Sequence, residues 1–174
     1  RGLQGQGLLY ATSNRGGCHM RGNMIGLEVL GLPKLIDRFR VQGKSSFVIL
    51  NQNSNAAIDS LVLCKFTNMG VADEYFARVL SAVTGIQYAT TDLIKVGERV
   101  WNLERLYNNR EGFTTNDDTL PLRLLTEAPV DGPSKGWVSQ LAPMLKEYYR
   151  TRGWDENGVP SKQKLTELGL ANLM

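Results

Sequence analysis

Apolar residues recur three and four positions apart along most of the second half of the chain. This spacing predicts helices over 73–85, 90–112, 141–153 and 161–169, each ending at a glycine. Two consecutive threonines, Thr90 and Thr91, offer side-chain oxygens that can cap the start of the second of these helices. The second half of the chain is therefore predicted to be helical.

The first half is harder to assign, because eight glycines lie between Gly2 and Gly31. Glycine disfavours the interior of helices and strands, so loops are expected to form much of this region. Shorter helices are predicted over 3–11, 33–39 and 45–55. Val and Ile do not alternate with polar residues here, which argues against a large sheet. The predicted fold class is all-α, an irregular multihelical domain with long loops.

A long connection separates the second and third helices of the C-terminal half. Residues 109–137 are rich in Asn, Asp, Thr, Gly and Pro, and an apolar stretch at 120–125 interrupts them. Connections of this length are commonly functional loops, linkers or arms. We therefore expect 109–137 to be an ordered arm within a single helical domain over 1–174.

Composition narrows the class of protein further. Apolar residues make up 42% and charged residues 21% of 174, which is typical of a folded globular domain. The net charge of +3 is spread along the chain, so nucleic acid and anionic membranes are not the expected partners. No apolar run is long enough for a bilayer or for a signal peptide, and a cytoplasmic location is expected.

Common catalytic motifs are missing from the sequence. The glycines at 5 and 7 lack the third glycine and the preceding strand of a dinucleotide-binding motif. The chain has no phosphate-binding loop, no closely spaced cysteine pair for zinc and no nucleophile elbow around a serine. Nucleotide, zinc and Ser-His-Asp chemistry are therefore disfavoured.

Two short segments carry the candidate chemistry. In the first, Arg15 and Arg21 flank the chain's single histidine, His19, which suits an anionic ligand and proton transfer near neutral pH. In the second, Asp59 and Cys64 lie among apolar residues, where a carboxylate needs a donor and a thiolate needs a metal or a cation. The structural alternative is that the arginines are solvated, His19 completes a local hydrogen-bond network, Cys64 is an ordinary core thiol and Asp59 caps a helix.

Taken together, these segments resemble the tungsten-containing aldehyde:ferredoxin oxidoreductase family. The resemblance is carried by YATSNRGGCHMR at 10–21 and DSLVLCKF at 59–66, in that order and at that spacing. Further likeness lies in ERLYNNREGF at 104–113, DDTLP at 117–121 and YYRTRGWDENG at 148–158. It corresponds to the family's C-terminal helical region, so we expect the chain to be the C-terminal part of a larger multidomain oxidoreductase.

The resemblance implies a set of cofactors and residue roles. The family holds tungsten between two pterin dithiolenes beside a 4Fe-4S cluster, and it oxidises aldehydes to carboxylic acids with ferredoxin as acceptor. It implies that Cys64 is a cluster ligand and that His19 is catalytic, acting on the substrate oxygen. Pterin contacts are implied for five residues, namely Arg15, Arg21, Asp59, Leu63 and Lys65. Cys18 has no implied role and is expected to be a packing thiol.

Several alternatives stay open at this stage. The metal is tungsten or molybdenum, and related helical domains also occur in enzymes that use the same cofactor to reduce aromatic thioesters. A cofactor-free helical interaction module is the rival from another class. The implied partners are ferredoxin, an aldehyde, the N-terminal domains of the same polypeptide and, as an open alternative, a second copy of the chain. We expect the 174-residue chain alone to be inactive, because one thiolate cannot hold four irons.

One position departs from the family pattern. The family commonly has Gly three residues after the aspartate, whereas this chain has Val62. Because glycine is typical where a ligand approaches the backbone closely, a side chain at position 62 reduces the room for a pterin there.

Overall fold

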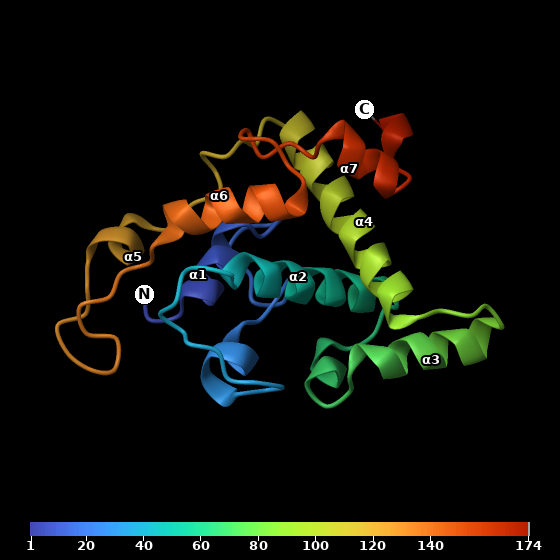
Figure 1. Ribbon diagram of the computed structural model, residues 1–174, viewed down its shortest axis with the longest axis horizontal. Coiled ribbons are helices and arrows are strands. Elements are labelled where there is room, and N and C mark those ends of the chain that lie inside the picture. The colour runs from blue at the N-terminus through green and yellow to red at the C-terminus, as the bar shows by residue number, and fades with distance from the viewer. Residues whose placement is uncertain (174) are drawn as a thin grey trace.

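The computed structural model describes residues 1–173 and shows a helical protein throughout them (Figure 1). Within this range no β-strand forms, and isolated bridges join Asn14 to Gly16 and Trp154 to Pro160. The α-helices are α1 (Gln4–Ala11), α2 (Lys44–Ser60), α3 (Asp73–Thr84), α4 (Thr90–Arg110), α5 (Leu122–Thr126), α6 (Leu141–Arg152) and α7 (Lys162–Glu167). Shorter turns are the π-helix η1 (Gly26–Leu30) and the 3-10 helices η2 (Lys65–Met69) and η3 (Ala171–Leu173). The predicted all-α class is confirmed.

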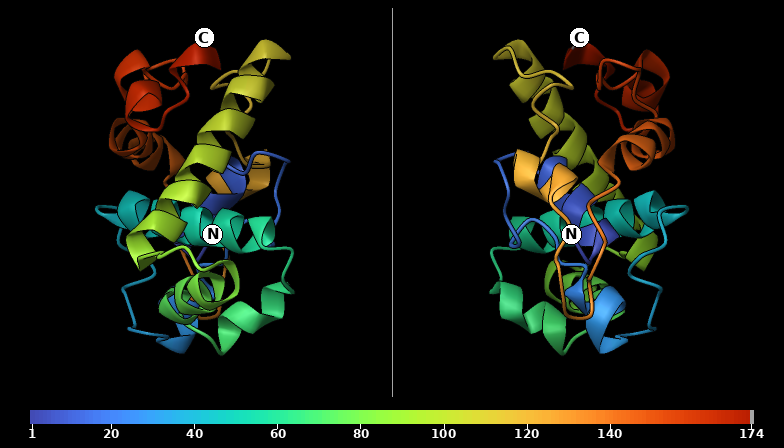
Figure 2. Two further views of the ribbon diagram at one scale, coloured as in Figure 1. Left: turned by 90° about the vertical axis from the view of Figure 1, so that its right-hand side faces the viewer. Right: turned by 90° about the vertical axis from the view of Figure 1, so that its left-hand side faces the viewer.

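Helix α2 occupies the centre of the fold and packs against α1, α4 and α6. Figure 2 shows α4 crossing α2 at a steep angle. The backbones meet at Gly97, where an added Cβ atom would lie 1.8 Å from the carbonyl oxygen of Asn53 on α2. Only glycine allows this approach, so the residue type at position 97 fixes how closely the two helices pack.

The main core is formed by apolar side chains from α1, α2, α4 and α6, among which Leu8, Leu9, Val48, Trp101 and Tyr148 are fully buried. The indole of Trp101 donates a hydrogen bond to the Tyr148 hydroxyl at 3.1 Å, which satisfies both polar groups inside the core.

A buried guanidinium, Arg152, extends the core through polar contacts. It donates to Tyr148, Asn53 and Gln52 at 3.1, 2.6 and 2.8 Å, and its cation lies 5.4 Å from the centre of the Trp101 ring. These partners are neutral, so the charge is stabilised by amide and hydroxyl oxygens and by an aromatic face rather than by a carboxylate.

Glu28 explains why a helix forms in the glycine-rich opening. Its buried carboxylate accepts hydrogen bonds from the backbone N–H groups of Gly5 and Gln6 at 2.8 and 3.1 Å, in the first turn of α1. Lys44 pairs with the same carboxylate at 2.6 Å. A remote acidic residue therefore caps a helix that has no side-chain cap of its own.

The 109–137 segment contains α5 and is tied to the helices at its start. Arg105 of α4 makes two 2.8 Å hydrogen bonds to the buried carboxylate of Asp118, which also accepts from the Tyr149 hydroxyl at 2.6 Å. Burial, and then the Asp118 hydrogen bond, raise the pKa of Tyr149 well above its usual range. Near the far end, Phe39 stacks on Trp137. That the segment is an ordered arm of a single domain stays a prediction.

The structure corrects the predicted helix over 33–39. Residues 33–39 form turns instead, and the Asp37 carboxylate accepts a hydrogen bond from the Phe39 N–H at 2.9 Å, a contact that favours a turn over a helix. Helix formation occurs earlier, in η1.

Two helix ends also differ from the prediction. Helix α2 does not stop near residue 55 but continues to Ser60, because Ala56, Ala57 and Ile58 are buried against neighbouring helices. At the start of α4 the threonine side chains do not cap the helix. The N-cap is Ala89, whose backbone N–H donates to the Asp92 carboxylate at 2.8 Å.

We expect Gly97→Ala to lower the free energy of unfolding by about 1–3 kcal/mol or more, the cost of overpacking at a tight helix crossing. The sign is diagnostic, because Gly→Ala in an uncrowded helix interior stabilises by about 1 kcal/mol. Denaturant unfolding checks it, with exposed Arg99→Ala on the same helix as a control expected within about 0.5 kcal/mol of wild type. A stabilised Gly97→Ala protein would contradict the crossing.

Candidate functional site

The candidate site lies where α2 ends beside α4. Residues 12–21, called the site loop below, follow α1 and carry the first predicted segment. Asp59 lies in the last turn of α2, and residues 63–65 follow that helix after a two-residue turn. The tertiary structure therefore brings together two segments that are nearly forty residues apart in the chain, as shown by the contact between residues 21 and 59.

Arg21 joins the two segments. Its guanidinium donates to Asp59 Oδ2 at 3.1 Å and also contacts the carboxylate of Glu104 on α4. The same cation lies 5.8 Å from the centre of the Trp101 ring. The Arg21 side chain is 11% exposed whereas Asp59 is 39% exposed, so the arginine is the buried support and the aspartate is accessible.

The position of Asp59 rules out the helix-cap alternative. It lies at the C-terminal end of α2, where the carbonyl groups carry partial negative charge and a carboxylate is unfavourable. A capping carboxylate would belong at the other end of a helix. Arg21 offsets this repulsion, so Asp59 is stabilised by its ion pair and not by its helix.

Lys65 belongs to the same group of charged side chains. Burial lowers the pKa of Lys65 to about 8, and the charges of Asp59, Arg21, Cys18 and Arg15 all act on it. Its Nζ atom is buried and has no hydrogen-bond partner within residues 1–173, and the same holds for Nε of Arg21. Unpartnered cationic donors of this kind fit an anionic or acceptor-rich group such as a pterin.

Cys18 was expected to be a packing thiol, but its surroundings are polar. It is partly exposed and accepts a hydrogen bond from the Arg15 guanidinium at 3.2 Å. Burial acts to raise its pKa, but the hydrogen bonds from Arg15 and from the backbone at Met20 and Arg21 outweigh this, so the pKa of Cys18 is lowered. The thiol therefore belongs to the polar surroundings of the site loop.

The remaining predicted residues face outward. His19 and Cys64 are exposed, and Leu63 is 41% exposed. Within residues 1–173 no three His, Cys, Asp or Glu side chains gather into a possible metal site. The geometry brings Arg15, Arg21, Asp59 and Lys65 into one group, and it leaves His19, Leu63 and Cys64 accessible beside that group.

Val62 adopts a backbone conformation that explains the family's glycine. Its φ is 57°, in the left-handed region that favours glycine and that is costly for a β-branched residue. The side chain is 91% exposed, so it crowds nothing within the described chain. The turn between α2 and Cys64 is therefore built around a left-handed residue.

Glu104 was missed by the sequence analysis as a site residue. Its second oxygen accepts from the Asn14 side chain at 3.0 Å, and Asn108 donates to the Asn14 carbonyl at 2.8 Å. Glu104 and Asn108, together with Trp101, recur three and four positions apart and so share one face of α4. The signal in the sequence that could have identified Glu104 was its position at helical spacing from Trp101 and Asn108.

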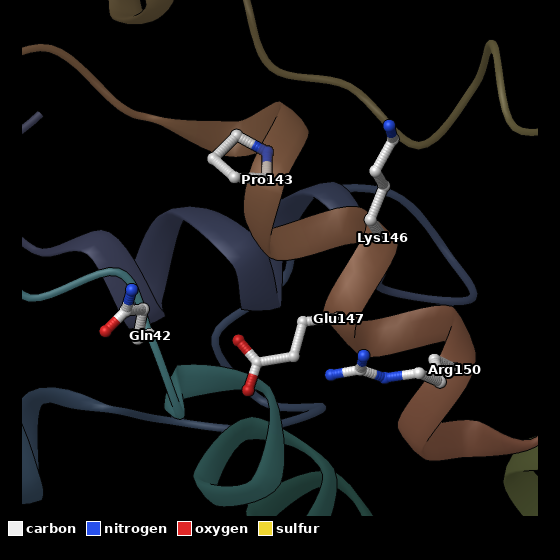
Figure 3. Close-up of a pocket in the computed structure, with 5 residues that line it drawn as sticks. All are labelled: Gln42, Pro143, Lys146, Glu147 and Arg150. Carbon is white, nitrogen blue, oxygen red and sulfur yellow. The ribbon is translucent and has the colours of Figure 1, made fainter.

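A hollow of about 390 Å³ over α6 lies apart from the site (Figure 3). Its lining includes Glu147, whose two carboxylate oxygens accept from the Gly43 N–H at 3.0 and 3.2 Å. Gly43 is the N-cap of α2, so Glu147 caps that helix. None of the predicted site residues lines this hollow.

Comparison with known proteins identifies the class of this helical chain. The family model described as aldehyde ferredoxin oxidoreductase, domains 2 and 3, matches residues 1–170. The chain therefore belongs to the aldehyde ferredoxin oxidoreductase family.

None of the helices within residues 1–173 is both long and apolar enough to cross a membrane.

Individual relatives refine this assignment. The chain is 46% identical over 173 residues to the tungsten-containing aldehyde ferredoxin oxidoreductase of Pyrococcus furiosus, and 45% identical over 176 residues to that of Pyrococcus horikoshii. These alignments cover 98% and 100% of this chain but 29% of each relative. The chain thus spans less than a third of the length of these enzymes.

A solved structure shares the fold. The active-site complex BamBC of benzoyl-coenzyme A reductase, bound to 1,5-dienoyl-CoA, matches 80% of this chain and 21% of its own, with a TM-score of 0.61 and 21% identity. At this level of identity the likeness concerns the fold alone.

We expect Val62→Gly to raise the free energy of unfolding by about 1 kcal/mol, because it removes the side-chain penalty of the left-handed conformation. Val130→Gly is the matched control, since Val130 is 85% exposed and has an ordinary negative φ. That control should be neutral or slightly destabilising. Equal effects of the two substitutions in denaturant unfolding would contradict the strain at Val62.

Proposed function

We propose that this chain forms the helical part of the active site of a tungsten-pterin, iron–sulfur oxidoreductase that oxidises aldehydes to carboxylic acids, with ferredoxin as electron acceptor. The observation that carries the proposal is 46% identity, over 98% of the chain, to an enzyme of that name. Oxidation of an aldehyde takes oxygen from water and releases electrons and protons. The tungsten cofactor supplies the redox chemistry when bound.

Pterin binding is assigned to the group around Arg21. The exposed oxygen of Asp59 accepts hydrogen bonds from an amino-pyrimidine edge, while Arg15 and Lys65 present donors to the same ligand. The unpartnered buried atoms Lys65 Nζ and Arg21 Nε support this assignment, because a bound acceptor would satisfy them. Leu63 contributes an apolar contact next to these groups.

Cys64 is assigned as a ligand of a 4Fe-4S cluster. Its thiol is exposed directly after the Val62 turn and next to Lys65, so a cluster brought by another part of the polypeptide can reach it. Thiolates are the usual cluster ligands. Since the chain has only two cysteines, it cannot supply four thiolate ligands, and the remaining ligands are assigned to the N-terminal domains.

His19 is assigned the proton transfer at the substrate oxygen. It is exposed on the site loop that Arg15 and Arg21 bracket, and it is the single histidine of the chain. An imidazole can hold or release a proton near neutral pH, which suits a reaction that releases protons.

The N-terminal domains of the same polypeptide are the proposed partner of α3. This helix exposes Tyr75, Val79 and Val83 at 56, 62 and 79%, four residues apart and therefore on one face. An apolar stripe of this kind is typical of a surface that another unit covers. Ferredoxin as acceptor and a cytoplasmic location complete the proposal, and a second copy of the chain stays an open alternative.

Two other functions are weaker. Reduction of an aromatic thioester rests on a fold likeness at 21% identity, which is far below the identity to the aldehyde enzymes. A cofactor-free interaction module leaves the buried, unpartnered donors at the site unexplained. Tungsten, molybdenum and iron analysis of the full-length protein separates the metal alternatives, and absence of these metals would reject the proposed function.

In the full-length protein, we expect Cys64→Ser to lower the iron content and to abolish ferredoxin reduction, because serine is a poor cluster ligand. The helical fold should persist, since Cys64 is exposed. Iron analysis and ferredoxin reduction measure the effect, and Cys18→Ser is the matched control for iron content. Unchanged iron and ferredoxin reduction in Cys64→Ser would show that this thiol is not a ligand.

For His19→Asn, we expect normal tungsten and iron contents and a kcat per bound tungsten lower by about 10²- to 10⁴-fold, the loss typical of a general acid or base. A structural histidine would behave differently, because its loss would lower cofactor content or thermal stability and leave normalised turnover intact. A normalised rate within about threefold of wild type, which is under 1 kcal/mol of barrier, rejects the catalytic assignment.

A further inference from the structure

The carboxylate of Glu104 on α4 contacts the site loop at two positions, Asn14 near its start and Arg21 at its end. One oxygen accepts a hydrogen bond from the side chain of Asn14 at 3.0 Å, and the other accepts from the Arg21 guanidinium. The six residues between these two contacts include Arg15, Cys18 and His19. A single side chain therefore fixes where this segment of the loop begins and where it ends.

The rest of α4 reinforces the contact at the start of the loop. The Asn14 side chain also donates to the carbonyl of Trp101 at 3.3 Å, and the Asn108 side chain donates to the Asn14 carbonyl at 2.8 Å. A long helix that packs on α2 is a rigid support. The start of the loop is thus held on the same face of α4 that carries Glu104.

The contact of Arg21 with Glu104, at the end of the loop, determines which oxygen of Asp59 stays free for a ligand. Arg21 lies between the carboxylates of Glu104 and Asp59, and its guanidinium carbon is 5.8 Å from the centre of the Trp101 ring. It donates to Oδ2 of Asp59, and Oδ1 receives no hydrogen bond from residues 1–173. Without Glu104, Arg21 would be free to turn fully toward Asp59 and occupy both of its oxygens, as bidentate pairs do.

We propose that Glu104 is a positioning residue for the cofactor site. Its carboxylate contacts the loop that carries His19 at two positions, and it holds Arg21 so that one oxygen of Asp59 stays free for a ligand. This role rests on the proposed function for its effect on turnover. Its effect on the loop follows from the contacts alone. Groups that orient residues contacting a cofactor typically change affinity or activity by about 10- to 100-fold when replaced.

The test uses the full-length protein with Glu104→Gln, which keeps the shape of the side chain and removes its charge. Glu98→Gln is the matched control, because Glu98 lies on the same helix, is 24% exposed against 33% for Glu104, and pairs with Lys164 away from the site loop. If Glu104→Gln does not fold, Glu104→Asp replaces it, since the shorter side chain keeps the charge but cannot reach both ends of the loop.

Hydrogen exchange of the 15–20 amides is the first readout and needs no activity. We expect Glu104→Gln to accelerate this exchange by about tenfold, the factor that corresponds to one lost charge-assisted hydrogen bond, whereas Glu98→Gln leaves it unchanged. The second readout is kcat per bound tungsten, which we expect to fall by about 10- to 100-fold in Glu104→Gln alone.

Unchanged loop exchange in Glu104→Gln overturns the proposal. Faster exchange with turnover per tungsten within about threefold of the Glu98→Gln control also overturns it, because Glu104 would then support the fold and not the site. A wild-type protein without tungsten or molybdenum would refute the proposed function instead, and the exchange comparison would then decide the role of Glu104 by itself.

Discussion

The arrangement of this protein depends on the close crossing of α2 and α4 at Gly97. An added Cβ atom there would meet the Asn53 carbonyl at 1.8 Å, so no side chain can separate the two helices. Because they touch, the end of α2 comes beside the middle of α4. Arg21 can then contact Asp59 on one helix and Glu104 on the other. A backbone contact between two helices therefore decides how the elements that carry the candidate site are placed.

Two guanidinium groups, those of Arg152 and Arg21, lie near the Trp101 ring, and they are stabilised in different ways. Arg152 is fully buried, 5.4 Å from the ring centre, and its side-chain partners are neutral. Arg21 is 5.8 Å from the same ring and pairs with carboxylates. Neutral oxygen atoms are enough to stabilise Arg152, which is fully buried and out of a ligand's reach. Arg21 instead lies between two carboxylates, so a bound ligand can change the balance of charge around it.

The site is polar and only half enclosed within this chain. Asp59, His19 and Cys64 are accessible, and the buried donors of Lys65 and Arg21 have no partner in the described residues. These features agree with a chain that spans 29% of the length of its relatives. The strained left-handed Val62, two residues before Cys64, belongs to the same pattern, since backbone strain is commonly retained at functional sites.

The sequence by itself determined the helical class and most of the helices, because apolar spacing and terminal glycines are local properties of the chain. It also pointed to the residues around His19 and Cys64, through motifs that resemble one family. It could not show that 33–39 is a turn, that α2 runs on to Ser60 or that Glu104 joins the site. Those outcomes depend on burial and on contacts between residues up to about ninety positions apart, such as Asn14 with Glu104, and only the tertiary structure brings such groups together.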